Sequence, residues 1–95
     1  MSTKNLNVID NREERRFEAQ LEDDQIAFIE YSDDGEVVAM THTEVPPDFE
    51  GKGVGSQLVK GALNAVKNAG KKVNPTCPFV AAYIKKHSEY ESLVA

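Results

Sequence analysis

The sequence contains little of what marks exported or membrane-spanning proteins. Its one cysteine, Cys77, cannot form an intramolecular disulfide, and a zinc site built from several thiolates is excluded. No stretch of about 18 apolar residues occurs, and the polar residues 1–11 lack the apolar segment of a signal peptide. We therefore expect a cytoplasmic protein, with no metal site and no membrane contact.

Acidic and basic side chains are divided unevenly between the two halves of the chain. Residues 1–50 carry 4 basic and 14 acidic side chains, whereas residues 51–95 carry 7 basic and 2 acidic ones. Most of the chain would repel a nucleic acid, which argues against that class of partner. The basic half favours a small polyanion and the acidic half a cationic partner, although chance sorting of solvated charges gives the same pattern.

The first half of the chain has the pattern of a strand meander. A chain of 95 residues is expected to form one core, so residues 1–95 are one domain. Alternating apolar residues and Asp-rich turns predict strands at residues 15–22, 25–32 and 36–45, with a further strand at residues 6–9.

The second half is predicted to contain two helices and one more strand. Apolar residues spaced three and four apart predict a helix over residues 54–69, ended by Gly70. A short strand at residues 72–77 follows, and Pro78 opens a second helix that runs to about residue 87.

This order predicts an α+β fold, with a mostly antiparallel sheet of four to five strands and two helices, in the order β(β)ββ-α-β-α. A connection through a helix joins parallel strands with a right-handed crossover. The strands that end at Val45 and Cys77 should therefore be neighbours, with their carboxyl ends together. Ligands of open α/β sheets bind at such an edge.

A glycine-rich turn precedes the first predicted helix. It comprises Glu50, Gly51, Lys52, Gly53, Val54, Gly55 and Ser56. The first N–H groups of a helix have no partner within it and carry the positive end of its dipole, so they favour an anion. Lys52 adds charge and Ser56 a hydroxyl. The spacing fits neither a P-loop nor the GxGxxG dinucleotide motif, so another kind of phosphate site or a turn needed only for packing remains.

Gly53-Val54-Gly55, following Glu50, resembles the R/Q-x-x-G-x-G/A signature of the GNAT N-acetyltransferases. The segments Thr41–Pro47 and Cys77–Phe79 are similar to the minimal branch of that superfamily, and the likeness spans about residues 14–90. The resemblance implies an acetyl-CoA-dependent N-acetyltransferase whose glycine turn holds the pyrophosphate of coenzyme A.

In that superfamily the pantetheine arm lies between two parallel strands, which here are those ending at Val45 and Cys77. Glu50 stands where the signature has Arg or Gln, so the backbone amides and Lys52 must contribute more to phosphate binding. The helix pair that follows the first strand in larger members is absent, as is their closing strand pair. The acceptor is therefore not implied by the resemblance.

Acetyl transfer needs a base for the amine, a donor for the oxyanion and a proton for the leaving thiolate. The two-residue period of a strand places His42 and Glu44 on the same face as Val38 and Met40, unless a bulge interrupts it. Either residue is a candidate base. The alternatives are a hydrogen-bonded strand histidine and a solvated glutamate.

Cys77 precedes Pro78, at the N-cap of the last helix, where the dipole favours a thiolate. An acetyl-Cys77 intermediate with His42 as base is a second route, and the resemblance implies this His and Cys as the suspected catalytic pair. A small buried side chain is the alternative for Cys77. For Tyr83, core packing is favoured over a role as acid.

Lys85 and Lys86 end the last helix, where they either complement its dipole or meet the 3′-phosphate of coenzyme A. The predicted function is transfer of an acetyl group to a primary amine of a cationic small molecule or protein lysine, by a monomer or homodimer. The alternatives are a non-catalytic module that binds coenzyme A and an interaction domain that uses an exposed edge strand.

Overall fold

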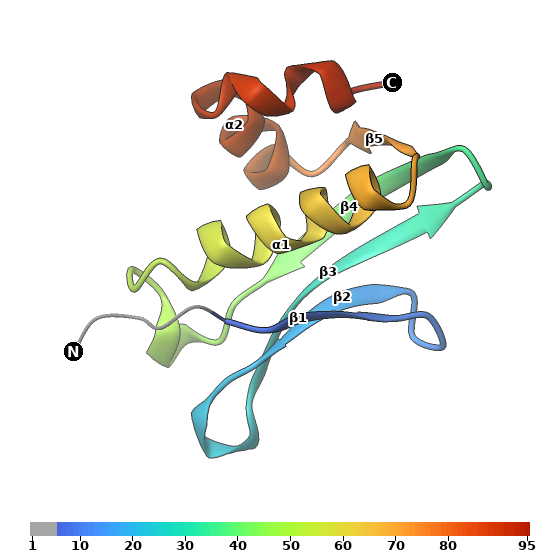
Figure 1. The fold of residues 1–95 in the computed structure, drawn as a ribbon. Helices are drawn as coiled ribbons and strands as arrows, with labels where there is room; N and C mark the ends of the chain where they lie inside the picture. Colours follow the sequence, from blue (N-terminus) through green and yellow to red (C-terminus); the bar gives the residue numbers. More distant parts are fainter. Residues whose placement is uncertain (1–5) are drawn as a thin grey trace.

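A five-stranded sheet forms the centre of the computed structural model, which describes residues 6–95 (Figure 1). The strands lie side by side in chain order, with three antiparallel pairs followed by one parallel pair. The elements are β1 (Val8–Asn11), β2 (Arg16–Gln20), β3 (Ile26–Asp33), β4 (Val37–Glu44), α1 (Val54–Asn68), β5 (Lys72–Pro75) and α2 (Pro78–Lys86). Short 3₁₀ helices span Glu22–Asp24, Pro47–Phe49 and Ser88–Leu93. The predicted fold class and element order are confirmed.

The turn between β3 and β4 forms because its aspartates satisfy the backbone. Asp33 Oδ1 accepts the N–H of Gly35 at 2.8 Å, and Gly35 has a φ of +100°, which glycine adopts without strain. Asp34 Oδ1 accepts the N–H groups of Val37 and Glu36, which lower the pKa of that carboxyl. The hairpin predicted at this point is confirmed.

Helix α1 packs along one face of the sheet with the apolar stripe that its sequence predicts. Its buried residues are Val54, Leu58, Val59, Ala62, Leu63 and Val66. They meet core residues of the sheet such as Phe17, Ile29 and Met40. Gly61 lets β1 lie close, because a Cβ there would be 2.5 Å from Val8 Cγ2.

The carboxyl end of α1 closes on Gly70, whose φ is +73°. The N–H of Gly70 donates to the carbonyl of Lys67, and the N–H of Lys71 donates to that of Val66. This pair of bonds is a Schellman motif, and it satisfies carbonyl groups that the helix leaves without partners. The predicted end of the helix is confirmed within two residues.

Strand β5 pairs with β4 in parallel, from Val37 opposite Lys72 to Met40 opposite Pro75. The N–H of Cys77 then donates to the Met40 carbonyl at 2.9 Å. Beyond this point β4 continues to Glu44 without β5 beside it. The prediction that these two strands are parallel neighbours is confirmed.

The outer edge of β5 is partly covered by the last residues of the chain. Val94 forms a parallel bridge with Val73, and the N–H of Ala95 donates to the Val73 carbonyl at 2.9 Å. These bonds occupy backbone groups that an open edge strand would offer to another chain. The exposed edge expected for an interaction domain is therefore shorter than the sequence suggests.

Strand β4 contains a bulge that reverses its alternation. Glu30 of β3 lies opposite His42, but Tyr31 lies opposite Met40, so Thr41 is an extra residue. An extra residue shifts every later side chain to the other face. The uninterrupted alternation was therefore the wrong alternative, and His42 and Glu44 lie on the face opposite to Met40.

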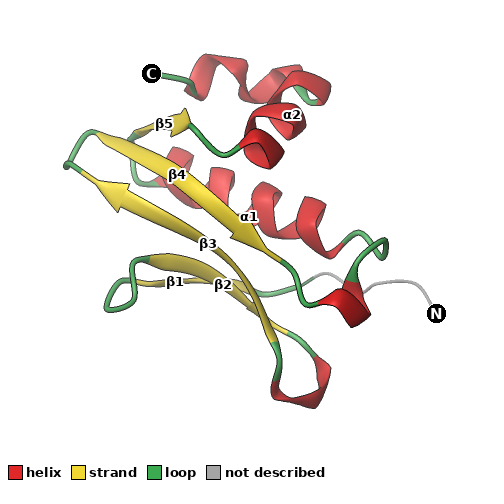
Figure 2. Cartoon of the chain, turned by 180° about the vertical axis from the view of Figure 1, so that it is seen from behind, coloured by secondary structure: helices red, strands yellow, loops and turns green. Residues whose placement is uncertain are grey.

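The face of the sheet that carries His42 and Glu44 has no helix over it within residues 6–95 (Figure 2). Phe28 lies on this face opposite Glu44, with the Arg16 guanidinium 4.6 Å from its ring centroid. In the described part of the chain, no helix is both long and apolar enough to span a membrane.

Candidate active site

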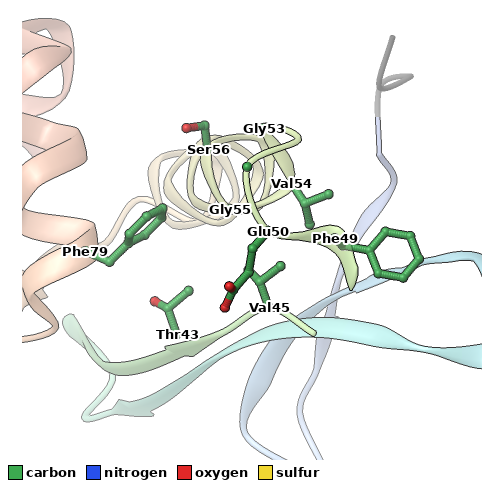
Figure 3. A pocket seen from close by; sticks show the side chains of 10 residues that line it. Thr43, Val45, Phe49, Glu50, Gly53, Val54, Gly55, Ser56 and Phe79 are labelled. Carbon is green, nitrogen blue, oxygen red and sulfur yellow. The ribbon is translucent and has the colours of Figure 1, made fainter. Parts of the chain in front are cut away.

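A cavity of about 440 Å³ lies where the end of β4 meets the amino ends of α1 and α2 (Figure 3). It is lined by Thr43, Val45, Phe49, Glu50, Gly51, Gly53, Val54, Gly55, Ser56 and Phe79. Residues from β4, the following loop and both helices thus converge, although they are up to 36 positions apart in the sequence. The cavity lies at the sheet edge where the sequence predicts a ligand.

The amino end of α1 forms one wall of the cavity with bare backbone. Its N-cap is Gly53, which has a φ of +80° and makes no side-chain capping bond. Gln57 N–H donates to the Gly53 carbonyl at 3.1 Å, which begins the helical bonding and leaves the N–H groups before it without helical partners. The first turn contains no acidic residue. The donors and the dipole there fit a phosphate group.

The absence of a side chain at Gly55 permits the close approach of Phe79 from α2. A Cβ at this position would lie 2.7 Å from Cζ of Phe79, whose side chain reaches across from the first turn of α2 (Figure 3). Phe79 is 45% exposed, which is unusual for so large an apolar residue. Its ring thus forms an apolar wall beside the bare backbone of α1.

The predicted cofactor-binding residues divide into three groups. Those that line the cavity are Val45, Gly51, Gly53, Val54, Gly55 and Ser56. Lys52 lies in the same turn, with its ammonium 5.7 Å from the Phe49 ring centroid. Lys85 and Lys86 lie at the carboxyl end of α2, opposite the end that carries Phe79, and do not line the cavity. Their contact with a 3′-phosphate stays a prediction.

Cys77 lies beside the cavity, in contact with Thr43. It is 5% exposed, and its Sγ is 3.3 Å from Thr43 Oγ1. The thiol makes no close capping hydrogen bond. Burial raises the pKa of the thiol, but the Thr43 hydroxyl opposes it. The N–H groups of Val80, Phe79 and Thr43 add to this effect, so the pKa lies below its usual value of 9.0.

His42 and Glu44 pair with each other rather than with Cys77. His42 Nε2 is 3.1 Å from Glu44 Oε1, and both side chains are more than half exposed. Because the bulge at Thr41 turns them away from the face of Thr43, the predicted Cys/His pair is not formed by direct contact. Thr43 is the residue that contacts the thiol.

Tyr83 is buried, and its ring stacks on His87 with centroids 3.9 Å apart. The predicted core packing of this tyrosine is confirmed. Its burial raises the pKa of its hydroxyl.

Three residues of the cavity wall were missed by sequence reasoning: Thr43, Phe49 and Phe79. Thr43 was not considered, because alternation without a bulge puts His42 and Glu44, not Thr43, on the face of Met40. Phe79 follows the Cys77-Pro78 pair that marks the start of α2, and this position on the first turn of a helix was the available signal.

Most of this chain is similar to known proteins. A family model described as GCN5-related N-acetyl-transferase matches residues 16–93. Protein NATD1 of Mus musculus is 31% identical over 85 residues, which cover 86% of this chain and 76% of that protein. Protein NATD1 of Xenopus tropicalis is 30% identical over 88 residues, which cover 90% of this chain and 80% of that protein.

The fold also matches a solved structure. The solution NMR structure of a GCN5-like protein from Staphylococcus aureus superposes with a TM-score of 0.70, at 24% identity. The match covers 98% of this chain and 91% of the other. With the family model matching 78 residues that include the whole cavity wall, this chain belongs to the GCN5-related N-acetyltransferase family.

Proposed function

We propose that this domain binds acetyl-CoA and transfers its acetyl group to a primary amine. The observation that carries the proposal is the cavity at the bare amino end of α1, bounded by Thr43 and adjoining the Cys77 thiol. Membership of the GCN5-related N-acetyltransferase family supports the same chemistry. The residues present fit such a donor, because helix N–H groups and apolar side chains meet in one cavity.

The pyrophosphate is assigned to the unpartnered N–H groups at the start of α1, beside Gly51 and Ser56. The pantetheine arm is assigned to the neutral walls that Val45 and Phe79 provide. Thr43 lies at the end of β4 that adjoins Cys77, so this placement brings the thioester toward the thiol.

The acceptor is assigned to the other face of the sheet. From Thr41 to Glu44, β4 has no strand beside it on the β5 side, because the pairing ends at Met40. His42 and Glu44 face outward over this stretch while Thr43 faces the cavity. A donor on the inner face and an amine on the outer face would meet at this free strand edge.

Two routes fit these positions. In direct attack, the His42–Glu44 pair accepts the ammonium proton, directly or through water, and the neutral amine displaces the thiol of coenzyme A. In the covalent route, the Cys77 thiolate attacks the thioester, an acetyl-Cys77 thioester forms and coenzyme A leaves as a thiolate that takes up a proton. The amine then takes the acetyl group and regenerates the thiol.

The outer face favours a cationic acceptor. Glu30 lies directly opposite His42 on β3, and Glu44 is two residues further along β4, so exposed carboxylates flank the assigned approach. Carboxylates attract an ammonium group, and salt screens that attraction. Acetylation of a lysine-containing peptide should therefore be faster than that of an amine with a neighbouring carboxylate, and the difference should shrink with added salt.

The test is an assay of free thiol release from acetyl-CoA with a panel of such amines, alongside calorimetric binding of coenzyme A. Direct attack predicts that His42→Ala loses about 100-fold in rate while Cys77→Ala keeps its activity. The covalent route predicts that Cys77→Ala loses its activity. It also predicts that the intact mass of the wild type, incubated with acetyl-CoA, increases by one acetyl group. Absence of coenzyme A binding at millimolar concentration would contradict the proposal.

A further inference from the structure

The cavity wall carries a single charged side chain, and that side chain is acidic. Among its ten lining residues, nine are neutral and the tenth is Glu50. A cavity that receives a pyrophosphate is expected to have basic residues in its wall. Glu50 is exposed to solvent and therefore accessible to a ligand.

The backbone directs Glu50 into the cavity. Its N–H donates to the Pro47 carbonyl at 3.3 Å, which ends the 3₁₀ helix Pro47–Phe49. From there its side chain points into the space between α1 and β4 (Figure 3). The first turn of α1 contains no acidic residue, so the carboxylate of Glu50 is the negative charge of this wall.

Two opposing fields therefore act on an anionic ligand in this cavity. The N–H groups at the start of α1 and the Lys52 ammonium in the same turn attract it, and the carboxylate of Glu50 repels it. The remaining walls are neutral and largely apolar: Val45, Phe49 and Phe79. These walls can contact an uncharged arm but cannot neutralise a phosphate.

We propose that Glu50 is a specificity-determining residue that shifts recognition of the acyl donor from its phosphates to its pantetheine arm. The inference rests on the proposed function, because it concerns the donor that the same cavity binds. The substrate class is then the acyl-pantetheine thioester. Repulsion from Glu50 offsets part of the attraction between the phosphates and the N–H groups at the start of α1, so the phosphates contribute less to affinity than they would beside a neutral residue.

The size of the effect follows from Coulomb's law. A carboxylate and a phosphate about 6 Å apart near a solvated surface repel enough to change affinity by about 3- to 10-fold, and salt reduces that factor. An uncharged ligand is not repelled by the Glu50 carboxylate. The comparison of charged and uncharged ligands therefore isolates the charge of Glu50.

The test measures dissociation constants by calorimetry for coenzyme A and for pantetheine, which contains the arm without phosphate. Glu50→Gln keeps the size of the side chain and removes its charge. Glu36→Gln is the matched control, because Glu36 lies in the turn before β4, at the opposite end of that strand from the cavity. It changes the net charge by the same amount.

We expect Glu50→Gln to bind coenzyme A about 3- to 10-fold more tightly than the wild type at low salt, with less gain at 0.5 M salt and no change for pantetheine. Glu36→Gln should match the wild type. Equal coenzyme A affinity in Glu50→Gln and wild type would overturn the inference and leave the proposed function standing. Equal tightening of both ligands would overturn it too, since the effect would then be steric. Failure of every variant to bind either ligand would instead reject the proposed function, and this inference with it.

Discussion

The two helices begin at the same cavity but begin in different ways. Helix α1 starts from Gly53, which offers no side chain to its first N–H groups. Helix α2 starts from Cys77, whose side chain is buried. Burial raises the pKa of its thiol, but the Thr43 hydroxyl and the N–H groups of Val80 and Phe79 hold that pKa below its usual value. The N–H groups at the start of α1 are open to the cavity, whereas those at the start of α2 already act on the Cys77 thiol.

This difference separates two tasks that a helix dipole can perform. At α1 the field acts on whatever enters the cavity, because no side chain of the first turn competes for the N–H groups. At α2 the field acts on the Cys77 thiol and favours its anionic form. The ring of Phe79 lies close to Gly55, where the two helix ends meet. We call the amino end of α1 at Gly53 the open end, the amino end of α2 at Cys77 the thiol end, and the contact between Phe79 and Gly55 the joint. Three substitutions alter these features in turn.

The largest effect is expected from Gly53→Ala, which alters the open end. Gly53 has a φ of +80°, and an alanine in the left-handed region costs about 1–2 kcal/mol of unfolding free energy. Relief of that strain would reorient the N–H groups that face the cavity. We expect this loss of stability together with about tenfold weaker binding of coenzyme A, measured by urea denaturation and calorimetry.

Gly70→Ala is the matched control, because Gly70 has a φ of +73° at the other end of the same helix. Its loss of stability should be similar, but its affinity for coenzyme A should equal that of the wild type. If both variants lost affinity equally, the effect would come from the stability of α1, and the open amino end would have no special role.

The open end was also the part of the site most accessible to sequence reasoning. Glycines before an apolar stripe with a 3.6-residue period specify a helix start, and the structure places that start at Val54 as predicted. Local chemistry decides such a feature. The cap at Gly70 and the Asp-rich hairpin turn were predictable for the same reason.

The face of the sheet on which the residues after Thr41 lie was not predictable from local chemistry. The alternation of Val38, Met40 and His42 continues without a break in the sequence, whereas the register across β3 inserts Thr41 as an extra residue. A bulge is set by pairing between strands and not by the period of one strand. Sequence reasoning therefore placed His42, not Thr43, on the side of the thiol.

A smaller effect is expected from Thr43→Val, which alters the thiol end. Valine keeps the shape of the side chain but removes the hydroxyl 3.3 Å from Cys77 Sγ. The pKa of the thiol should rise toward its usual value of 9.0, because one group that favours the thiolate is lost. We expect alkylation by iodoacetamide at neutral pH to slow about threefold to tenfold, with a pH profile displaced upward.

Thr43→Ser is the control, because it retains the hydroxyl and should retain the pH profile. The lowered pKa of the Cys77 thiol also makes the free energy of unfolding depend on pH. The folded thiol has the lower pKa, so its contribution is complete above pH 9.0 and is lost as the pH falls through the folded value. The wild type should therefore gain stability over Thr43→Val as the pH rises toward 9. An unchanged alkylation profile in Thr43→Val would show that the N–H groups alone set the reactivity of Cys77.

The smallest effect is expected from Phe79→Ala, which alters the joint between the two helix ends. The ring is 45% exposed, so its removal should cost less than about 1 kcal/mol of unfolding free energy. It would also remove an apolar wall of the cavity. We expect about threefold weaker binding of coenzyme A and of pantetheine alike, since the lost contact is with the uncharged arm.

Gly55→Ala tests the same joint from the other helix. Its Cβ would lie 2.7 Å from Phe79 Cζ, and the half-exposed ring can move to relieve the overlap. This variant should therefore bind about as weakly as Phe79→Ala, and the double variant should lose no further affinity, because both changes act on one contact. Ile9→Ala removes another exposed apolar side chain, on β1, and should bind normally. If the losses of affinity in the double variant were additive, Phe79 and Gly55 would act on the ligand separately and not through one contact.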